Sequence, residues 1–201
     1  WKIPELSSIN MPIIDYNRFP YPFQRDERLS RSWNIPGTPG FIHQIGGLEK
    51  QGKEGKVSYD ADNHQKMVNL RAEKIAGIAR DFPELVVEGN EKARTLLVGW
   101  GSTYGSLKSV LHECELEGLA LALVHLRHLN PLPNELKVLF SHYDTILVAE
   151  LNSGQLCQLL RAQYLVDAKS ISQCDGQPFT VNTLIKAIKR EINYDECAIH
   201  S

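Results

Sequence analysis

Hydrophobic positions divide the chain into three stretches with different patterns. From Arg94 onward, short continuous apolar runs alternate with segments whose apolar residues recur every three or four positions. The first pattern is typical of strands buried on both faces, and the second is typical of amphipathic helices. Strands that alternate with such helices imply parallel pairing through crossover connections. Residues 84–195 are therefore predicted to form a three-layer α/β domain with a mostly parallel sheet.

The individual elements of this domain can be placed by their apolar residues. Continuous apolar runs predict strands at 95–100, 119–126 and 145–149, with a weaker strand at 165–171 and an edge strand at 85–87. Helical spacing predicts helices that include residues 107–114, 136–143, 156–164 and 181–192. Gly118 is suited to end the first of these helices, and Thr180 is suited to cap the last.

The first 83 residues follow neither pattern, apart from one helical segment. Residues 1–58 mix prolines with aromatic and arginine side chains, so long helices and central strands are not expected there. This arm is too aromatic for a free linker, and we expect it to lie extended over another surface. A helix is predicted at about residues 60–82, with Asp60 or Asp62 as its cap and Pro83 after its end. The expected divisions are thus 1–83, 84–195 and a tail, 196–201.

Composition and charge exclude several classes of protein. Hydrophobic residues make up 42% of the 201 residues, and the formal net charge is −2. Nucleic-acid binding, which usually needs a basic excess, is not expected.

The apolar runs are far shorter than the roughly 20 residues of a membrane helix, and no secretory segment is seen, so we expect a cytoplasmic protein. The chain begins with Trp1 rather than methionine, which suggests that it is part of something longer.

The cysteines do not indicate a metal site or a disulfide framework. Cys114, Cys157, Cys174 and Cys197 include no CxxC pair, the spacing typical of zinc ribbons and iron–sulfur clusters. Cys114 and Cys157 fall within helical apolar stripes, and we expect them to be small buried hydrophobic residues. No metal-binding residue is therefore predicted.

Polar residues gather in the loops that follow the predicted strands. In an open α/β sheet, ligands bind beyond the carboxyl ends of the strands, which here means loops 101–105, 127–133, 150–154 and 172–178. The candidates for a crest that binds an anion or a neighbouring protein surface are Ser102, Thr103, Arg127, His128, Asn130, Glu150, Asn152 and Gln155.

The glycine-rich loop GSTYG, residues 101–105, has two interpretations. Its backbone N–H groups could bind an anion, although it matches neither of the glycine-rich nucleotide motifs. Alternatively, it is a tight strand-to-helix turn in which Ser102 or Thr103 caps the helix.

The charged candidates are equally open to a structural interpretation. Arg127 could clamp a carboxylate or phosphate, or pair with an acid across a subunit contact, and His128 could shuttle protons. Glu150 could be a general base, or could pair with Arg127, while Asn152 could cap the next helix. No serine or cysteine stands in a known nucleophile context, so no catalytic residue is predicted.

Several stretches together resemble a known enzyme family. They are IPGTPGFIHQIGGLEKQGKEGKVSYDADNHQKMVNLRAEKIAGIA, GWGSTYG, HLRHLNPLP, AELNSGQLCQLLRAQYLVD and GQPF. In this order they resemble the C-terminal part of the α subunit of 2-oxoacid:ferredoxin oxidoreductases, over about residues 20–192. The 2-oxoglutarate branch of the family fits best.

The resemblance implies an activity for the complete enzyme. Such enzymes decarboxylate a 2-oxoacid on thiamine diphosphate, pass electrons through an iron–sulfur cluster to ferredoxin, and release an acyl-CoA. The resemblance further implies a transketolase C-terminal-like domain that helps assemble subunits, preceded in the same subunit by a pyrimidine-binding domain. A β subunit would hold the diphosphate, the magnesium and the cluster. This chain would then bind no cofactor and carry no catalytic centre.

Three other functions remain compatible with the residues. Glycine-rich turns at strand ends are also found in stand-alone modules that bind nucleotides or anions. A structural dimerisation module would show the same apolar pattern. A domain of a pyruvate-type 2-oxoacid oxidoreductase would share the resemblance.

Overall fold

The computed structural model describes the backbone of residues 15–199 and the side chains as far as Ile192, so the Cys197 side chain and residues 200–201 of the expected tail lie outside the described part of the chain. The chain divides into two compact units, Trp1–Arg80 and Asp81–Ser201, which are described separately. Among the described residues, no helix combines the length and the apolar character needed to cross a membrane.

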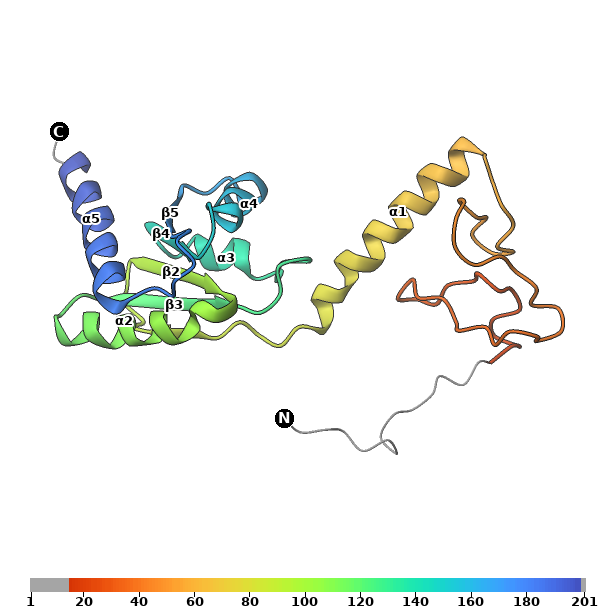
Figure 1. The fold of residues 1–201 in the computed structure, drawn as a ribbon, viewed down its shortest axis with the longest axis horizontal. Helices are drawn as coiled ribbons and strands as arrows, with labels where there is room; N and C mark the ends of the chain where they lie inside the picture. The colour runs from red at the N-terminus through yellow and green to blue at the C-terminus, as the bar shows by residue number, and fades with distance from the viewer. Residues whose placement is uncertain (1–14, 200–201) are drawn as a thin grey trace, which may run out of the picture. The chain divides into compact units, whose positions relative to one another are not determined.

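A five-stranded sheet is the centre of the second unit (Figure 1). Its strands are β1 (Val87–Gly89), β2 (Thr95–Trp100), β3 (Leu121–Leu126), β4 (Thr145–Glu150) and β5 (Ala168–Ser172), in the order β1-β3-β2-β4-β5. Strands β3, β2, β4 and β5 are parallel, and β1 is antiparallel at the edge. The predicted mostly parallel α/β fold is confirmed.

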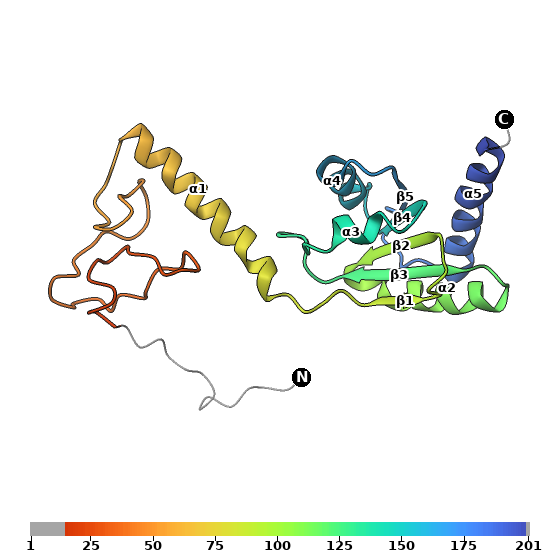
Figure 2. The ribbon, with the colours of Figure 1, turned by 180° about the vertical axis from the view of Figure 1, so that it is seen from behind.

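Helices cover both faces of this sheet, which gives three layers (Figures 1 and 2). Helices α2 (Tyr104–Leu116) and α5 (Val181–Ile199) pack on one face, and α3 (Leu136–Phe140) and α4 (Gln155–Tyr164) pack on the other. Successive residues of β2 alternate between the layers: Leu96 contacts the cluster with α3 and α4, and Leu97 contacts the cluster with α2 and α5. Because both side-chain directions are buried, the strand is a continuous apolar run.

The sequence prediction was wrong about the ends of several elements. Strand β3 begins at Leu121 rather than at residue 119, β4 ends at Glu150 rather than at residue 149, and β5 is Ala168–Ser172 rather than 165–171. The edge strand is Val87–Gly89 rather than 85–87. Helix α3 ends at Phe140, and the N–H groups of His142 and Tyr143 then bond to carbonyls three residues earlier, so the expected helical stripe continues as turns. The helix predicted over about 60–82 also ends early, at Gly77, and a 3-10 turn (Ile78–Asp81, η2) follows it before Pro83.

The first unit consists of an irregular arm and one long helix, α1 (Ala61–Gly77). The Asp60 carboxylate caps this helix by accepting a hydrogen bond from the Asn63 N–H at 2.7 Å, which confirms one of the two predicted caps. The described part of the arm is irregular, as predicted, with isolated backbone bridges between Arg25 and Arg31 and between Lys50 and Val57. Its expected extension over another surface stays a prediction.

Replacing Leu123 by alanine tests the double-sided core. Leu123 is fully buried in β3, so Leu123→Ala should lower the free energy of unfolding by about 2–5 kcal/mol through lost burial and the cavity left behind. Leu116→Ala is the control, because this leucine is 70% exposed and its loss should change stability by less than about 0.5 kcal/mol. Urea unfolding measures both variants, and equal effects would contradict the layered core.

Candidate functional site

The eight predicted crest residues follow three neighbouring strands at their carboxyl ends. The strand order places β2 between β3 and β4, so the loops after these strands meet at one edge of the sheet. Ser102 and Thr103 follow β2, while the others follow β3 and β4. The structure divides the crest into a central turn, a β4 side that supports a helix, and a β3 side that borders a cleft.

The central turn joins β2 to α2, as the strand-to-helix interpretation of GSTYG predicted, but without the predicted side-chain cap. Gly101–Thr103 forms one 3-10 turn (η3), in which Gly101 has a φ of 62°. The buried Thr103 hydroxyl donates to the Trp100 carbonyl at 2.8 Å and accepts from the Trp100 N–H at 3.2 Å. Thr103 therefore ties the turn to the end of the strand rather than capping α2, and Ser102 is exposed.

On the β4 side, Glu150 is fully buried and supports the start of α4. Its two carboxylate oxygens accept hydrogen bonds from the N–H groups of Leu156 and Cys157, both at 2.9 Å. These donors belong to the first turn of the helix, where N–H groups lack partners within the helix and a negative charge is favourable. The predicted pairing with Arg127 is wrong, because β2 separates the two strand ends and both oxygens of Glu150 are already bonded.

Asn152 stabilises the loop between β4 and α4. Its side-chain oxygen accepts from the N–H groups of Gly154 at 2.8 Å and Gln155 at 3.3 Å, as the capping interpretation predicted. Gly154 has a φ of 88°, and a Cβ there would lie 3.1 Å from the Ser170 hydroxyl, so the loop depends on glycine. Gln155 is the exposed first residue of α4.

On the β3 side, the crest borders a cleft of about 580 Å³. It is formed by the ends of β3 and α2, by β1, and by the segment that precedes β1. The lining residues are Phe82, Pro83, Glu84, Leu85, Val86, Glu88, Tyr104, His125, Arg127, His128 and Pro133. Arg127 and His128 both line this cleft, whereas Asn130 lies exposed in the loop beyond them.

His125 is a cleft residue that the sequence analysis missed. Its register partner on β2 is Gly99, where a Cβ would overlap Leu107 and lie 3.5 Å from the imidazole ring. Tyr104 packs edge-on against the ring, with centroids 5.1 Å apart, and the buried Nε2 has no hydrogen-bond partner among the described residues. Burial lowers the pKa of His125, and the nearby Arg127 charge acts in the same direction.

Glu88 joins the edge strand to α2 and forms one wall of the cleft. Its carboxylate accepts from the Tyr104 hydroxyl at 2.9 Å and from the Lys108 ammonium. The Lys108 hydrogen bond is the main reason that the pKa of Glu88 is lowered. This carboxylate is therefore paired, and it fixes the Tyr104 ring beside His125.

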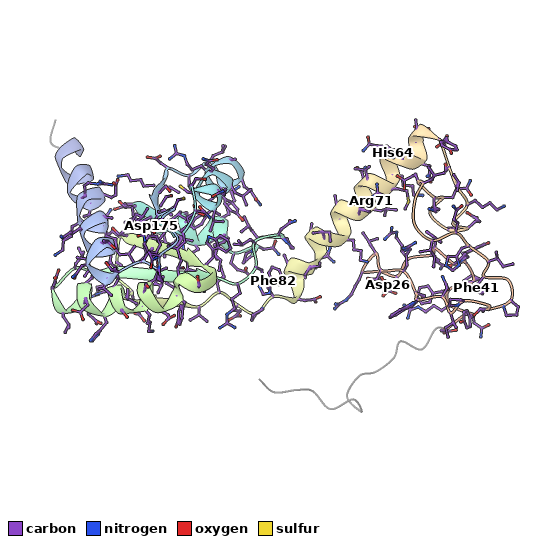
Figure 3. The ribbon with its side chains drawn as sticks, in the orientation of Figure 1. Asp26, Phe41, His64, Arg71, Phe82 and Asp175 are labelled. Atoms are coloured by element: carbon purple, nitrogen blue, oxygen red, sulfur yellow. The ribbon has the colours of Figure 1, made fainter. Side chains whose placement is uncertain are left out.

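Arg127 and His128, the two exposed crest residues that line the cleft, are held differently. The His128 ring stacks on Phe82, with centroids 4.0 Å apart and planes 13° apart (Phe82 is labelled in Figure 3). Arg127 is exposed and forms no ion pair with a described residue. The Arg127 guanidinium, beside an apolar wall, is suited to bind an anionic group, whereas no described residue of the cleft forms a nucleophile–base pair.

Comparison with known proteins relates the whole chain to one family of enzymes. No protein-family model matches the chain. It is 39% identical over 194 residues to 2-oxoglutarate oxidoreductase subunit KorA of Mycobacterium tuberculosis, covering 94% of this chain and 29% of that protein. It is 24% identical over 161 residues to the 2-oxoacid:ferredoxin oxidoreductase subunit alpha of Saccharolobus solfataricus, covering 77% of this chain and 25% of that protein.

A solved structure agrees with these relatives. The 2-oxoglutarate:ferredoxin oxidoreductase from Magnetococcus marinus, with 2-oxoglutarate, coenzyme A and succinyl-CoA bound, superposes with a TM-score of 0.77 at 28% identity. The match covers 85% of this chain and 30% of that chain. The α/β fold and the similarity along almost the whole length define a domain of an oxidoreductase subunit. The chain belongs to the family of 2-oxoacid:ferredoxin oxidoreductase α subunits, as the C-terminal part, and spans less than a third of the curated relatives it matches.

Changing Glu150 to glutamine tests its role under α4. Glu150→Gln keeps one acceptor oxygen but points an NH2 group at a backbone N–H, so it should cost about 1–3 kcal/mol of stability. Glu115→Gln removes the same charge from an exposed position of α2 and should change stability by less than about 0.5 kcal/mol. Thermal unfolding compares them. A Glu150→Gln variant as stable as the control would refute the capping role.

The lowered pKa of His125 predicts a pH dependence of stability. Below the ordinary pKa of 6.5, the unfolded chain takes up a proton that the folded chain resists, so this residue makes unfolding more favourable as the pH falls. Between pH 7.5 and 5.5, the wild-type free energy of unfolding should therefore fall more than that of His125→Gln. His112→Gln, at an exposed position of α2, should behave as the wild type. Urea unfolding at both pH values measures this difference, and parallel losses in all three proteins would disprove it.

Proposed function

We propose that this chain is part of the α subunit of a 2-oxoglutarate:ferredoxin oxidoreductase. The complete enzyme would oxidatively decarboxylate 2-oxoglutarate to an acyl-CoA and pass the electrons to ferredoxin. The observation that carries the proposal is the 39% identity to a 2-oxoglutarate oxidoreductase subunit along 94% of this chain. The TM-score of 0.77 with another 2-oxoglutarate enzyme supports the same substrate.

The described residues do not fit the cluster or the metal that the family implies. Iron–sulfur clusters are bound by cysteine thiolates, whereas burial raises the pKa of the Cys114 and Cys157 thiols and so favours their neutral form. Cys157 also bonds to the Ala168 carbonyl. No three His, Cys, Asp or Glu side chains among the described residues are grouped so that they could hold a metal ion. In this proposal thiamine diphosphate, magnesium, the cluster and CoA are bound by other parts of the enzyme.

This chain then serves in assembly. The arm exposes large apolar side chains, including Ile35 at 64%, Ile42 at 95% and Ile45 at 78%, which suits burial against a neighbouring surface. The proposed neighbours are the pyrimidine-binding domain of the same subunit and the β subunit, with ferredoxin as the partner of the whole enzyme. Ser102, Arg127, His128, Asn130 and Gln155, as the exposed part of the crest, would contact such neighbours. A cytoplasmic location belongs to the same proposal.

Turnover by the complete enzyme and by this chain alone tests the proposal. The α subunit containing this chain, purified with its β subunit, should reduce an electron acceptor when given 2-oxoglutarate and CoA, and should use pyruvate at least about tenfold less efficiently in kcat/KM. The 201-residue chain alone should show no turnover with thiamine diphosphate present.

The outcomes separate the parts of the proposal. A preference for pyruvate would contradict the substrate, and decarboxylation by the isolated chain would contradict the assembly role. Deleting residues 15–80 from the subunit should abolish co-purification of the β subunit, or reduce it severely. Size-exclusion chromatography measures this loss, and an intact complex would show that the arm is not needed for assembly.

A further inference from the structure

The first unit contains a second cleft, of about 820 Å³, between the arm and α1. Its size is within the range of small-molecule sites. Arg71, labelled on α1 in Figure 3, is one of the residues that line this cleft. The charged side chains that line it are Arg25, Arg31, Lys50, Arg71, Lys74 and Glu49.

The charged side chains that line this cleft are mostly positive, unlike those of the chain as a whole. Five of the lining side chains are lysine or arginine and one is acidic, although the whole chain has a formal net charge of −2. The single carboxylate, Glu49, is already paired: Arg71 donates to both of its oxygens, at 3.1 and 3.4 Å, and His64 contacts it at 2.9 Å. A surplus of positive charge therefore remains on the other side chains.

Arg31 is held in a position suited to an oxyanion. Its guanidinium lies over the Phe23 ring, 4.2 Å from the centroid, and forms no ion pair with a described residue. Phe23 is itself buried against Gly55, where a Cβ would overlap the ring. Stacking restrains the plane of the guanidinium while its edge N–H groups remain available for bidentate hydrogen bonds.

Arg25 and Lys74 extend the same positive surface. Arg25 is backbone-bridged to Arg31, donates one hydrogen bond to the Leu29 carbonyl at 2.6 Å, and has a buried Nε without a partner among the described residues. Burial lowers the pKa of Arg25, and the charges of Arg31 and Arg71 lower it further. Lys74 lies on α1, one turn beyond Arg71, and has no ion-pair partner among the described residues.

We propose that this cleft binds the diphosphate group of a small ligand, either free or as part of a nucleotide. A diphosphate carries enough charge to neutralise several cations at once, and its oxygens match the edge of Arg31 and the ammonium of Lys74. Trp33, which lines the cleft and is 69% exposed, offers a ring on which a nucleobase can stack. This inference concerns the first unit alone and does not rest on the proposed function.

Calorimetric titration of the full 201-residue chain with inorganic pyrophosphate tests the site. Arg31→Gln and Lys74→Gln should each raise the Kd about tenfold or more, because each removes a charge-assisted contact. Lys56→Gln in the arm and Lys66→Gln on α1 remove the same charge from exposed positions outside the cleft and should leave the Kd within about twofold. Circular dichroism checks that each variant is folded. If one of the two cleft variants does not fold, the Kd of the other still tests the proposal.

Three further ligands distinguish the source of the diphosphate and exclude other chemistry. ADP that binds more tightly than pyrophosphate, with the gain lost in Trp33→Ala, would identify a nucleotide, whereas equal affinities would identify free diphosphate. Adenosine should not bind, and 2-oxoglutarate should bind at least about tenfold more weakly than pyrophosphate, because a dicarboxylate carries less charge. No binding of pyrophosphate, equal weakening by the control variants, or tighter binding of 2-oxoglutarate would each overturn the proposal.

Discussion

Burial of both faces of the central strands is the constraint on which the second unit depends. Leu96 and Val98 of β2 pack toward α3 and α4, and Leu97 packs toward α2 and α5, so neither face can be exposed to water without loss of the core. Crossover connections then bring every loop that follows a parallel strand to one edge of the sheet. The position of the crest is thus a consequence of topology. The crest residues available for binding are those whose side chains are not already bonded to the backbone of the fold.

Three of the eight crest residues serve the fold. Glu150 provides acceptors for the start of α4, Asn152 closes the loop before that helix, and Thr103 ties the turn after β2 to its strand. Each bonds backbone groups that would otherwise lack partners near the ends of buried elements. Arg127 and His128 are different, because the first has no ion pair among the described residues and the second is held by stacking on Phe82. They are therefore available for contacts outside this unit, together with the exposed Ser102, Asn130 and Gln155.

The sequence predicts what depends on local periodicity and misses what depends on strand order. Residues 95–100 were predicted as a strand and form one, because two-sided burial leaves a continuous apolar run. The predicted pairing of Glu150 with Arg127 was wrong because β2 lies between their strands. This strand order depends on packing between segments that are distant in the sequence. His125 was overlooked inside an apolar run, although a histidine in line with Gly99 of a neighbouring predicted strand could have been noticed. The cationic cleft of the first unit lies between α1 and loops without periodicity, so no local pattern indicates it.

The two units differ in what stabilises them. The second has apolar clusters on both faces of a sheet, whereas the described part of the first buries few apolar side chains, Phe23, Met67 and Ala79 among them. Side-chain bonds to backbone carbonyls hold part of the arm instead, such as the buried Lys50 ammonium on the Leu48 carbonyl at 2.6 Å. Because the first unit buries so little apolar area, this burial compensates for only a small part of the conformational entropy that the segment loses when it becomes ordered. The first unit should therefore gain stability from whatever binds its ordered state, since a bound ligand or neighbouring surface shifts the equilibrium by mass action.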